Sequence, residues 1–134
     1  MQAAAARIGA PLGHDFCAIS LSDIRKPWEL VERRLIAALE ADFVIAIYNP
    51  ASQSRREQIE RAKELMLQHL APTIPVVVGR NLSRDGESVE VVALKDLEPK
   101  TIDMRTLLIV GSSQTRTFRG PGETLFAYTP RSYD

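Results

Sequence analysis

The chain of 134 residues has little cysteine and histidine, and charge of neither sign prevails. Its one cysteine, Cys17, excludes an intramolecular disulfide and a zinc site built from several cysteines. Two histidines, His14 and His69, are too few for a histidine-rich centre, so we expect no metal. Lys and Arg total 17, as do Asp and Glu. Because this balance gives no overall field for nucleic acid or an anionic membrane, we expect neither as a partner.

Long hydrophobic runs are also missing. No apolar segment approaches the roughly 20 residues that a membrane-spanning helix needs. The first ten residues, MQAAAARIGA, lack the apolar core and cleavage site of a secretory signal. We therefore expect a soluble cytoplasmic protein. Hydrophobic side chains make up 45% of the sequence, enough for one compact core but not for two full domains, so we expect a single domain over residues 1–134.

Apolar runs alternate with amphipathic segments along the chain. Short apolar runs predict strands at residues 15–21, 43–48, 74–79, 89–93 and 106–110. Apolar residues at helical spacing predict helices over residues 28–41 and from a cap at Ser52 or Ser54 to about Leu70. The Asp85-Gly86 turn predicts a hairpin of 74–79 with 89–93. This order predicts a layered α/β domain, with helices flanking a mixed β-sheet.

The two ends of the chain give weaker signals. Residues 1–8 predict a helix that Gly9 and Pro11 stop. From Ser112 onward the sequence is rich in loop-forming residues, with an edge strand expected at 124–128. The segment 120–122, Gly-Pro-Gly, follows the last core strand without opening a helix, so we interpret it as an ordinary turn.

No motif for a catalytic nucleophile or a phosphate-binding loop is present. The sequence has no G-x-S-x-G, no Walker loop and no G-x-G-x-x-G after a strand. His14 and Asp15 could form a general base with its orienting carboxylate, but adjacent strand residues point to opposite faces. We therefore interpret His14 as a loop residue and Asp15 as the start of a strand. Cys17 is read as an inert core thiol, and His69 as a partner of a helix dipole. The catalytic residues are therefore left unassigned.

Three loops that border predicted strands are more informative. In open α/β sheets, ligands collect beyond the carboxyl ends of strands. The loops are Tyr48-Asn49-Pro50, Arg80-Asn81-Leu82-Ser83 and Met104-Arg105-Thr106. The first offers an aromatic face and an amide, and the second offers backbone groups freed by irregular structure. Together they can shape a pocket for a flat, polar ligand such as an adenosyl group, although each alone is a common loop.

Arginine outnumbers lysine in the sequence. The arginines include Arg55, Arg56, Arg61, Arg80, Arg84, Arg105, Arg116, Arg119 and Arg131. A guanidinium pairs with a carboxylate through a two-pronged hydrogen-bonded fork. A polycarboxylate ligand is therefore a natural partner. The alternative is that most of these side chains lie on a solvated surface.

Six segments resemble the carboxyl-terminal half of tetrapyrrole methylases, in order and over nearly the whole chain. They are GAPLGHDFCAISLSD, PWELVERRL, DFVIAIYNPASQSR, VVVGRN, DMRTLLIVGSSQTR and YTPRSY. HDFCAISLSD and IYNPASQSR are the more specific ones. The resemblance implies a homodimer that binds S-adenosyl-L-methionine between two α/β domains. It also implies methyl transfer to C17 of a tetrapyrrole substrate, with ring contraction, in cobalamin biosynthesis.

Matched to the family's motifs, the cofactor contacts of this half fall on Tyr48, Asn49, Leu82, Ser83, Met104, Arg105 and Thr106. The sulfonium of the cofactor is already activated, so such a site needs placement of the reactants more than a nucleophile. The family's amino-terminal domain has no counterpart in the sequence, and we expect a carboxyl-terminal methylase domain whose activity alone is in question. The alternatives are a non-catalytic module for binding a nucleotide or tetrapyrrole, or a structural or dimerisation domain.

Overall fold

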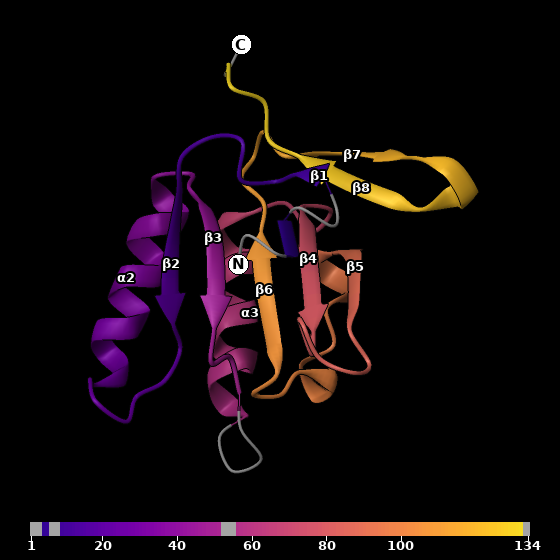
Figure 1. Cartoon of the computed structure of the whole chain (residues 1–134). Coiled ribbons are helices and arrows are strands. Elements are labelled where there is room, and N and C mark those ends of the chain that lie inside the picture. The colour runs from indigo at the N-terminus through magenta and orange to yellow at the C-terminus, as the bar shows by residue number, and fades with distance from the viewer. Residues whose placement is uncertain (1–3, 6–8, 52–55, 133–134) are drawn as a thin grey trace.

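A computed structural model describes residues 4–5, 9–51 and 56–132 of the chain. Within these residues, two α-helices cover one face of a five-stranded sheet, and a three-stranded sheet lies at one end of it (Figure 1). The main elements are β2 (Phe16–Ser20), α2 (Trp28–Glu40), β3 (Val44–Tyr48), α3 (Glu57–His69), β4 (Pro75–Arg80), β5 (Ser88–Ala93) and β6 (Thr106–Val110). The predicted order of strands and helices is confirmed.

The large sheet has the order β2-β3-β6-β4-β5. β2 pairs with β3 in parallel, whereas β6 runs antiparallel to both β3 and β4. The predicted hairpin is confirmed, since β4 and β5 pair antiparallel. The sheet is therefore mixed, as expected, and β2, β3 and β4 all run in one direction. No described helix is long and apolar enough to cross a membrane.

Both faces of the central strands are buried, which explains their continuous apolar sequences. On one face Ile45, Val76 and Leu108 join the cluster that α2 and α3 cover. On the other face Val44, Val77 and Ile109 pack together; the alanines Ala4, Ala5 and Ala127 complete that smaller cluster. A sheet covered on both sides presents only its edges to ligands, so the loops at the strand ends are the places to examine.

The tail differs from the prediction. The smaller sheet has the order β1-β8-β7, formed by β1 (Gly9–Ala10), β8 (Leu125–Tyr128) and β7 (Arg116–Arg119). β8 was expected as an edge strand but is the central strand of this sheet, and β7 was not predicted. All four residues of β7 are exposed, so no buried face marks them as a strand. The segment 120–122 forms the connection between β7 and β8, as the turn interpretation expected.

A buried chain of hydrogen bonds joins the smaller sheet to the rest of the molecule. The Thr129 hydroxyl donates to the Pro11 carbonyl at 2.7 Å and lies 2.8 Å from the Thr115 hydroxyl. The Thr115 oxygen in turn accepts the Ser112 amide at 2.9 Å. Of the helix expected over residues 1–8, only Ala4 and Ala5 are described, and both are helical and buried. The expected caps Ser52 and Ser54 lie outside the described residues.

Candidate functional site

The three predicted loops meet at one edge of the large sheet. β3 and β4 end at this edge and β6, which runs between them in the opposite direction, begins there (Figure 1). A hollow of about 300 Å³ lies at the meeting point. Its walls are Tyr48, Asn49, Asn81, Leu82, Arg84, Met104, Arg105, Thr106 and Leu107. Segments more than fifty residues apart in sequence thus form a single concave surface.

Most of the residues expected at a cofactor site line this hollow. They are Tyr48, Asn49, Leu82, Met104, Arg105 and Thr106. Ser83 does not line it, although it stands in the same loop between Leu82 and Arg84. Asn81, Arg84 and Leu107 were not among the expected contacts. Asn81 belongs to a loop that the sequence had already singled out. Arg84 was named among the arginines that could pair with carboxylates, but it was not expected at this site.

Left-handed backbone conformations shape two of the loops. Asn49, Asn81 and Ser83 have φ angles of 51°, 50° and 61°. Asparagine adopts this conformation more readily than most residues that carry a side chain, so it turns the chain sharply after β3 and again after β4. The Arg84 amide donates to the Asn81 carbonyl at 3.0 Å, which closes a turn. Among the described residues, no acceptor receives the amide N–H groups of Leu82 and Ser83, so both are available to a ligand.

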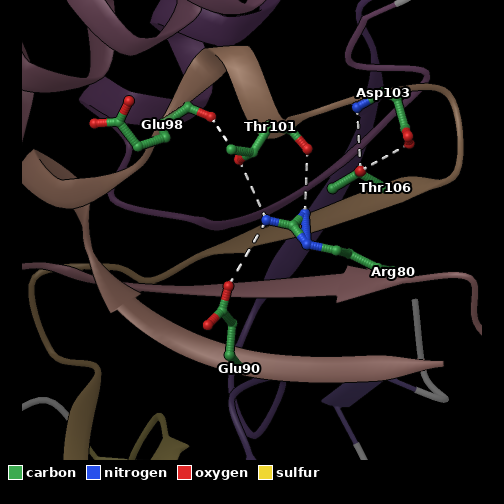
Figure 2. A network of polar contacts seen from close by, with 6 residues as sticks. All are labelled: Arg80, Glu90, Glu98, Thr101, Asp103 and Thr106. Carbon is green, nitrogen blue, oxygen red and sulfur yellow. Dashed lines mark hydrogen bonds and ion pairs between the residues drawn. The ribbon is translucent and has the colours of Figure 1, made fainter. Parts of the chain in front are cut away.

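The start of β6 is held by Asp103. Its carboxylate accepts the Arg105 amide at 2.8 Å, and the Thr106 amide donates to the Asp103 carbonyl at 3.1 Å. The same carboxylate accepts the Thr106 hydroxyl at 3.1 Å (Figure 2). The turn leaves Met104 with 65% of its side chain exposed beside the hollow. Asn81 joins this turn to the loop after β4, since its amide donates to the Arg105 carbonyl at 3.1 Å. Two walls of the hollow are thereby fixed to each other.

Arg80 supports the site from outside the hollow. Its guanidinium donates to the Thr101 hydroxyl at 3.3 Å and, at 3.5 Å, to the Thr101 carbonyl, and it lies 3.7 Å from the Glu90 carboxylate (Figure 2). The Thr101 hydroxyl donates to the Glu98 carbonyl at 2.8 Å. Arg80 therefore connects β4 and β5 to the segment that leads into β6, including the short helical turn η2 (Pro99–Thr101). We interpret it as a structural clamp on that segment.

The lining of the hollow suits a flat ligand with polar edges. Tyr48, Leu82 and Met104 offer aromatic or aliphatic surface, while the side-chain amides of Asn49 and Asn81 offer hydrogen-bond donors and acceptors. No histidine, cysteine or carboxylate is among the described lining residues. Nor do the residues that the structure describes contain a group of three side chains able to hold a metal ion. The arrangement can bind and orient a molecule through shape and hydrogen bonds.

The other candidates from the sequence lie elsewhere. His14 and Asp15 precede β2, at the end of the sheet opposite the hollow, and the His14 Nδ1 atom accepts the Asp15 amide at 2.8 Å. Cys17 is half-buried in β2, and its burial raises the pKa of the thiol, which disfavours the reactive thiolate. His69 ends α3, with Nδ1 2.9 Å from the Leu65 carbonyl oxygen. None of these groups contributes to the hollow.

Comparisons with known proteins all indicate the same family. The family model described as Tetrapyrrole (Corrin/Porphyrin) Methylases matches residues 1–98. The chain is 54% identical over 136 residues to the cobalamin biosynthesis protein CobIJ of Mycobacterium tuberculosis, covering 98% of this chain and 27% of that protein. It is 50% identical over 133 residues to a precorrin-3B C(17)-methyltransferase of Sinorhizobium sp, covering 99% and 52%. A crystal structure of the methyltransferase CobJ matches 97% of this chain and 52% of its own, with 45% identity and a TM-score of 0.87. The chain thus spans about half of these relatives or less.

The clamp role of Arg80 is testable by substitution. Arg80→Met keeps the aliphatic stem but removes the hydrogen bonds to Thr101, so we expect the free energy of unfolding to fall by about 1 kcal/mol in urea denaturation. Glu90→Gln removes only an ion pair whose carboxylate is 57% exposed, and should cost less than about 0.5 kcal/mol. Equal losses for the two variants would contradict the clamp.

Proposed function

Because the chain belongs to the tetrapyrrole methylase family, we propose that it forms one wall of the cofactor site of a methyltransferase that uses S-adenosyl-L-methionine. The observation that carries the proposal is the meeting of three separate loops in one hollow. The residues that would hold the adenosyl part are those of the three loops, Tyr48, Asn49, Leu82, Ser83, Met104, Arg105 and Thr106. Ser83 would contribute through its backbone amide, since its side chain is not part of the wall.

The hollow fits part of such a cofactor. Its volume of about 300 Å³ lies at the lower end of the range for small-molecule sites. The aromatic and aliphatic side chains suit the faces of a purine. The side-chain amides of Asn49 and Asn81 and the backbone amides of Leu82 and Ser83 suit its edges and the ribose hydroxyls. A second wall is needed to enclose the whole molecule. Since the chain spans about half of its relatives, we assign that wall to a region equivalent to the half of those relatives that the chain does not match.

The chemistry of the proposal relies on positioning. When bound, the cofactor supplies a methyl group already activated by its sulfonium. The residues of this chain then orient the nucleoside and exclude water from it. Correct orientation of two reactants can lower the activation barrier by roughly 7–11 kcal/mol. No side chain of the hollow is assigned a proton-transfer role. A chain that forms only one wall is expected to bind the cofactor more readily than to catalyse methyl transfer. The same behaviour is expected of a non-catalytic binding module.

The names of the relatives indicate a substrate. One of them is a precorrin-3B C(17)-methyltransferase and another is a cobalamin biosynthesis protein. We therefore include in the proposal a precorrin-3B substrate, methyl transfer to C17 and contraction of the ring, within corrin biosynthesis. Residues 1–134 would be the carboxyl-terminal domain of that enzyme. A cytoplasmic location belongs to the same proposal, and the single cysteine agrees with it.

A homodimer is the last part of the proposal, and the hairpin of β7 and β8 offers a surface for it. Phe118 and Phe126 are cross-strand partners with ring centroids 5.3 Å apart, and Tyr128 lies 6.0 Å from Phe118. Phe118 is 48% exposed and Tyr128 39%, on a hairpin that extends to one side of the molecule (Figure 1). Ala127 faces the other way and is buried. A contiguous exposed aromatic face is typical of a protein interface.

Isothermal titration with S-adenosylhomocysteine tests the cofactor site. We expect the chain to bind this demethylated form of the cofactor, and Met104→Ala to weaken binding about fivefold, because roughly 1 kcal/mol of apolar contact is lost. The matched control is Leu67→Ala, which removes an exposed apolar side chain on α3 and should leave binding unchanged. Absence of binding to the unmodified chain, or equal binding by both variants, would contradict the assignment of the hollow as a cofactor site.

Light scattering tests the dimer. The unmodified chain is expected to have twice the mass of one chain at micromolar concentration, and Phe118→Lys to halve it, because an ammonium would be desolvated in the interface. The control Ile24→Lys changes an equally apolar side chain that is 71% exposed outside the hairpin, and should stay dimeric. A monomeric unmodified chain would refute this part of the proposal.

A further inference from the structure

The described arginines differ in what their guanidinium groups contact and in where they lie. Five of them bind protein carbonyls or carboxylates, namely Arg56, Arg61, Arg80, Arg116 and Arg119. Arg84 and Arg105 are different, because both are exposed and both line the hollow. Among the described residues, no hydrogen bond or ion pair engages either of their guanidinium groups. These two cations are therefore free at the candidate site.

Although their guanidinium groups are free, the backbones of Arg84 and Arg105 are held by hydrogen bonds. Both are tied to the same residue, since the Asn81 carbonyl accepts the Arg84 amide at 3.0 Å and the Asn81 amide donates to the Arg105 carbonyl at 3.1 Å. The Arg84 carbonyl also accepts the Glu87 amide at 3.2 Å, and the Arg105 amide donates to Asp103 at 2.8 Å. Two arginines from two different loops are thus held around one residue, Asn81, at the rim.

Asp103 and Asp85 form no described ion pair with either arginine. Asp103 uses its Oδ1 atom to accept the Arg105 amide and the Thr106 hydroxyl, and no ion pair joins it to either guanidinium among the described residues. Asp85 follows Arg84 in sequence, but it is exposed and forms no described ion pair with it. A guanidinium has five donors in a planar fork that matches a carboxylate. Two such forks on separate loops suit a ligand with more than one carboxylate.

We propose that Arg84 and Arg105 bind carboxylate arms of a polycarboxylate macrocycle at the rim of the hollow. The proposal rests on the proposed function, which supplies the class of substrate. A single carboxylate, such as the one in the cofactor, needs only one fork, whereas a macrocycle with acid arms around its edge can engage both. Arg80 has no part in this recognition, because its guanidinium is used within the protein.

The test uses uroporphyrin, a fluorescent macrocycle with an acetate and a propionate arm on every pyrrole ring. Its binding to the chain is followed by fluorescence anisotropy. Arg84→Gln and Arg105→Gln should each weaken binding about tenfold, as expected when a charge-assisted hydrogen bond is lost. Arg84→Lys and Arg105→Lys should weaken it less, because they keep the charge without the fork. The matched control is Arg34→Gln, an exposed arginine on α2 away from the hollow, which should bind like the unmodified chain.

Titration of the same variants with S-adenosylhomocysteine separates the two proposals. We expect its affinity to be unchanged in Arg84→Gln, because Arg84 is not among the residues assigned to the cofactor. A parallel loss for this ligand in Arg84→Gln would assign that arginine to the cofactor and overturn the inference, as would unchanged uroporphyrin binding by either glutamine variant. If the unmodified chain binds S-adenosylhomocysteine but not uroporphyrin, only this inference fails; if it binds neither, the proposed function fails as well. Circular dichroism confirms that these exposed substitutions leave the fold intact.

Discussion

The position of β6 is the constraint on which the site depends. β6 is inserted between β3 and β4 and runs against both, so its first residues meet the last residues of its two neighbours. If β6 ran in the opposite direction, Met104 and Arg105 would lie at the far edge of the sheet. The ladder of hydrogen bonds on both sides of β6 therefore determines that three loops from distant parts of the sequence share one hollow.

The loops are rigidly mounted on this sheet. Strands buried on both faces cannot shift without opening the core, so their ends form a stiff base. Asp103 closes the turn before β6 and Arg80 fixes the segment leading to it (Figure 2). Asn81 joins the two loops. A site that works by placing its ligand needs this kind of support, because small displacements of the reacting groups are costly in rate.

The sequence predicted the large sheet well, because continuous apolar runs such as residues 43–48 directly reflect burial on two faces. It failed for β7, whose exposed residues carry no such pattern. The three loops were also expected to shape one pocket, from the general rule about strand ends. The residues alone do not specify the strand order that brings the loops together. Arg80 and Arg84 illustrate the remaining limit. They are the same residue type in one polar stretch, yet one is a clamp and the other lines the hollow, since tertiary contacts decide which guanidinium is used.

The central claim is that the edge formed by β3, β4 and β6 is the nucleoside-binding wall. Hydrogen exchange of the chain with and without S-adenosylhomocysteine tests it most directly, because bound ligand slows exchange of the amides it contacts. The account predicts added protection in peptides that contain Leu82, Ser83 and residues 104–106, with no change in the β7–β8 hairpin. Protection confined to other segments, with these amides exchanging as fast as in the free chain, would contradict it.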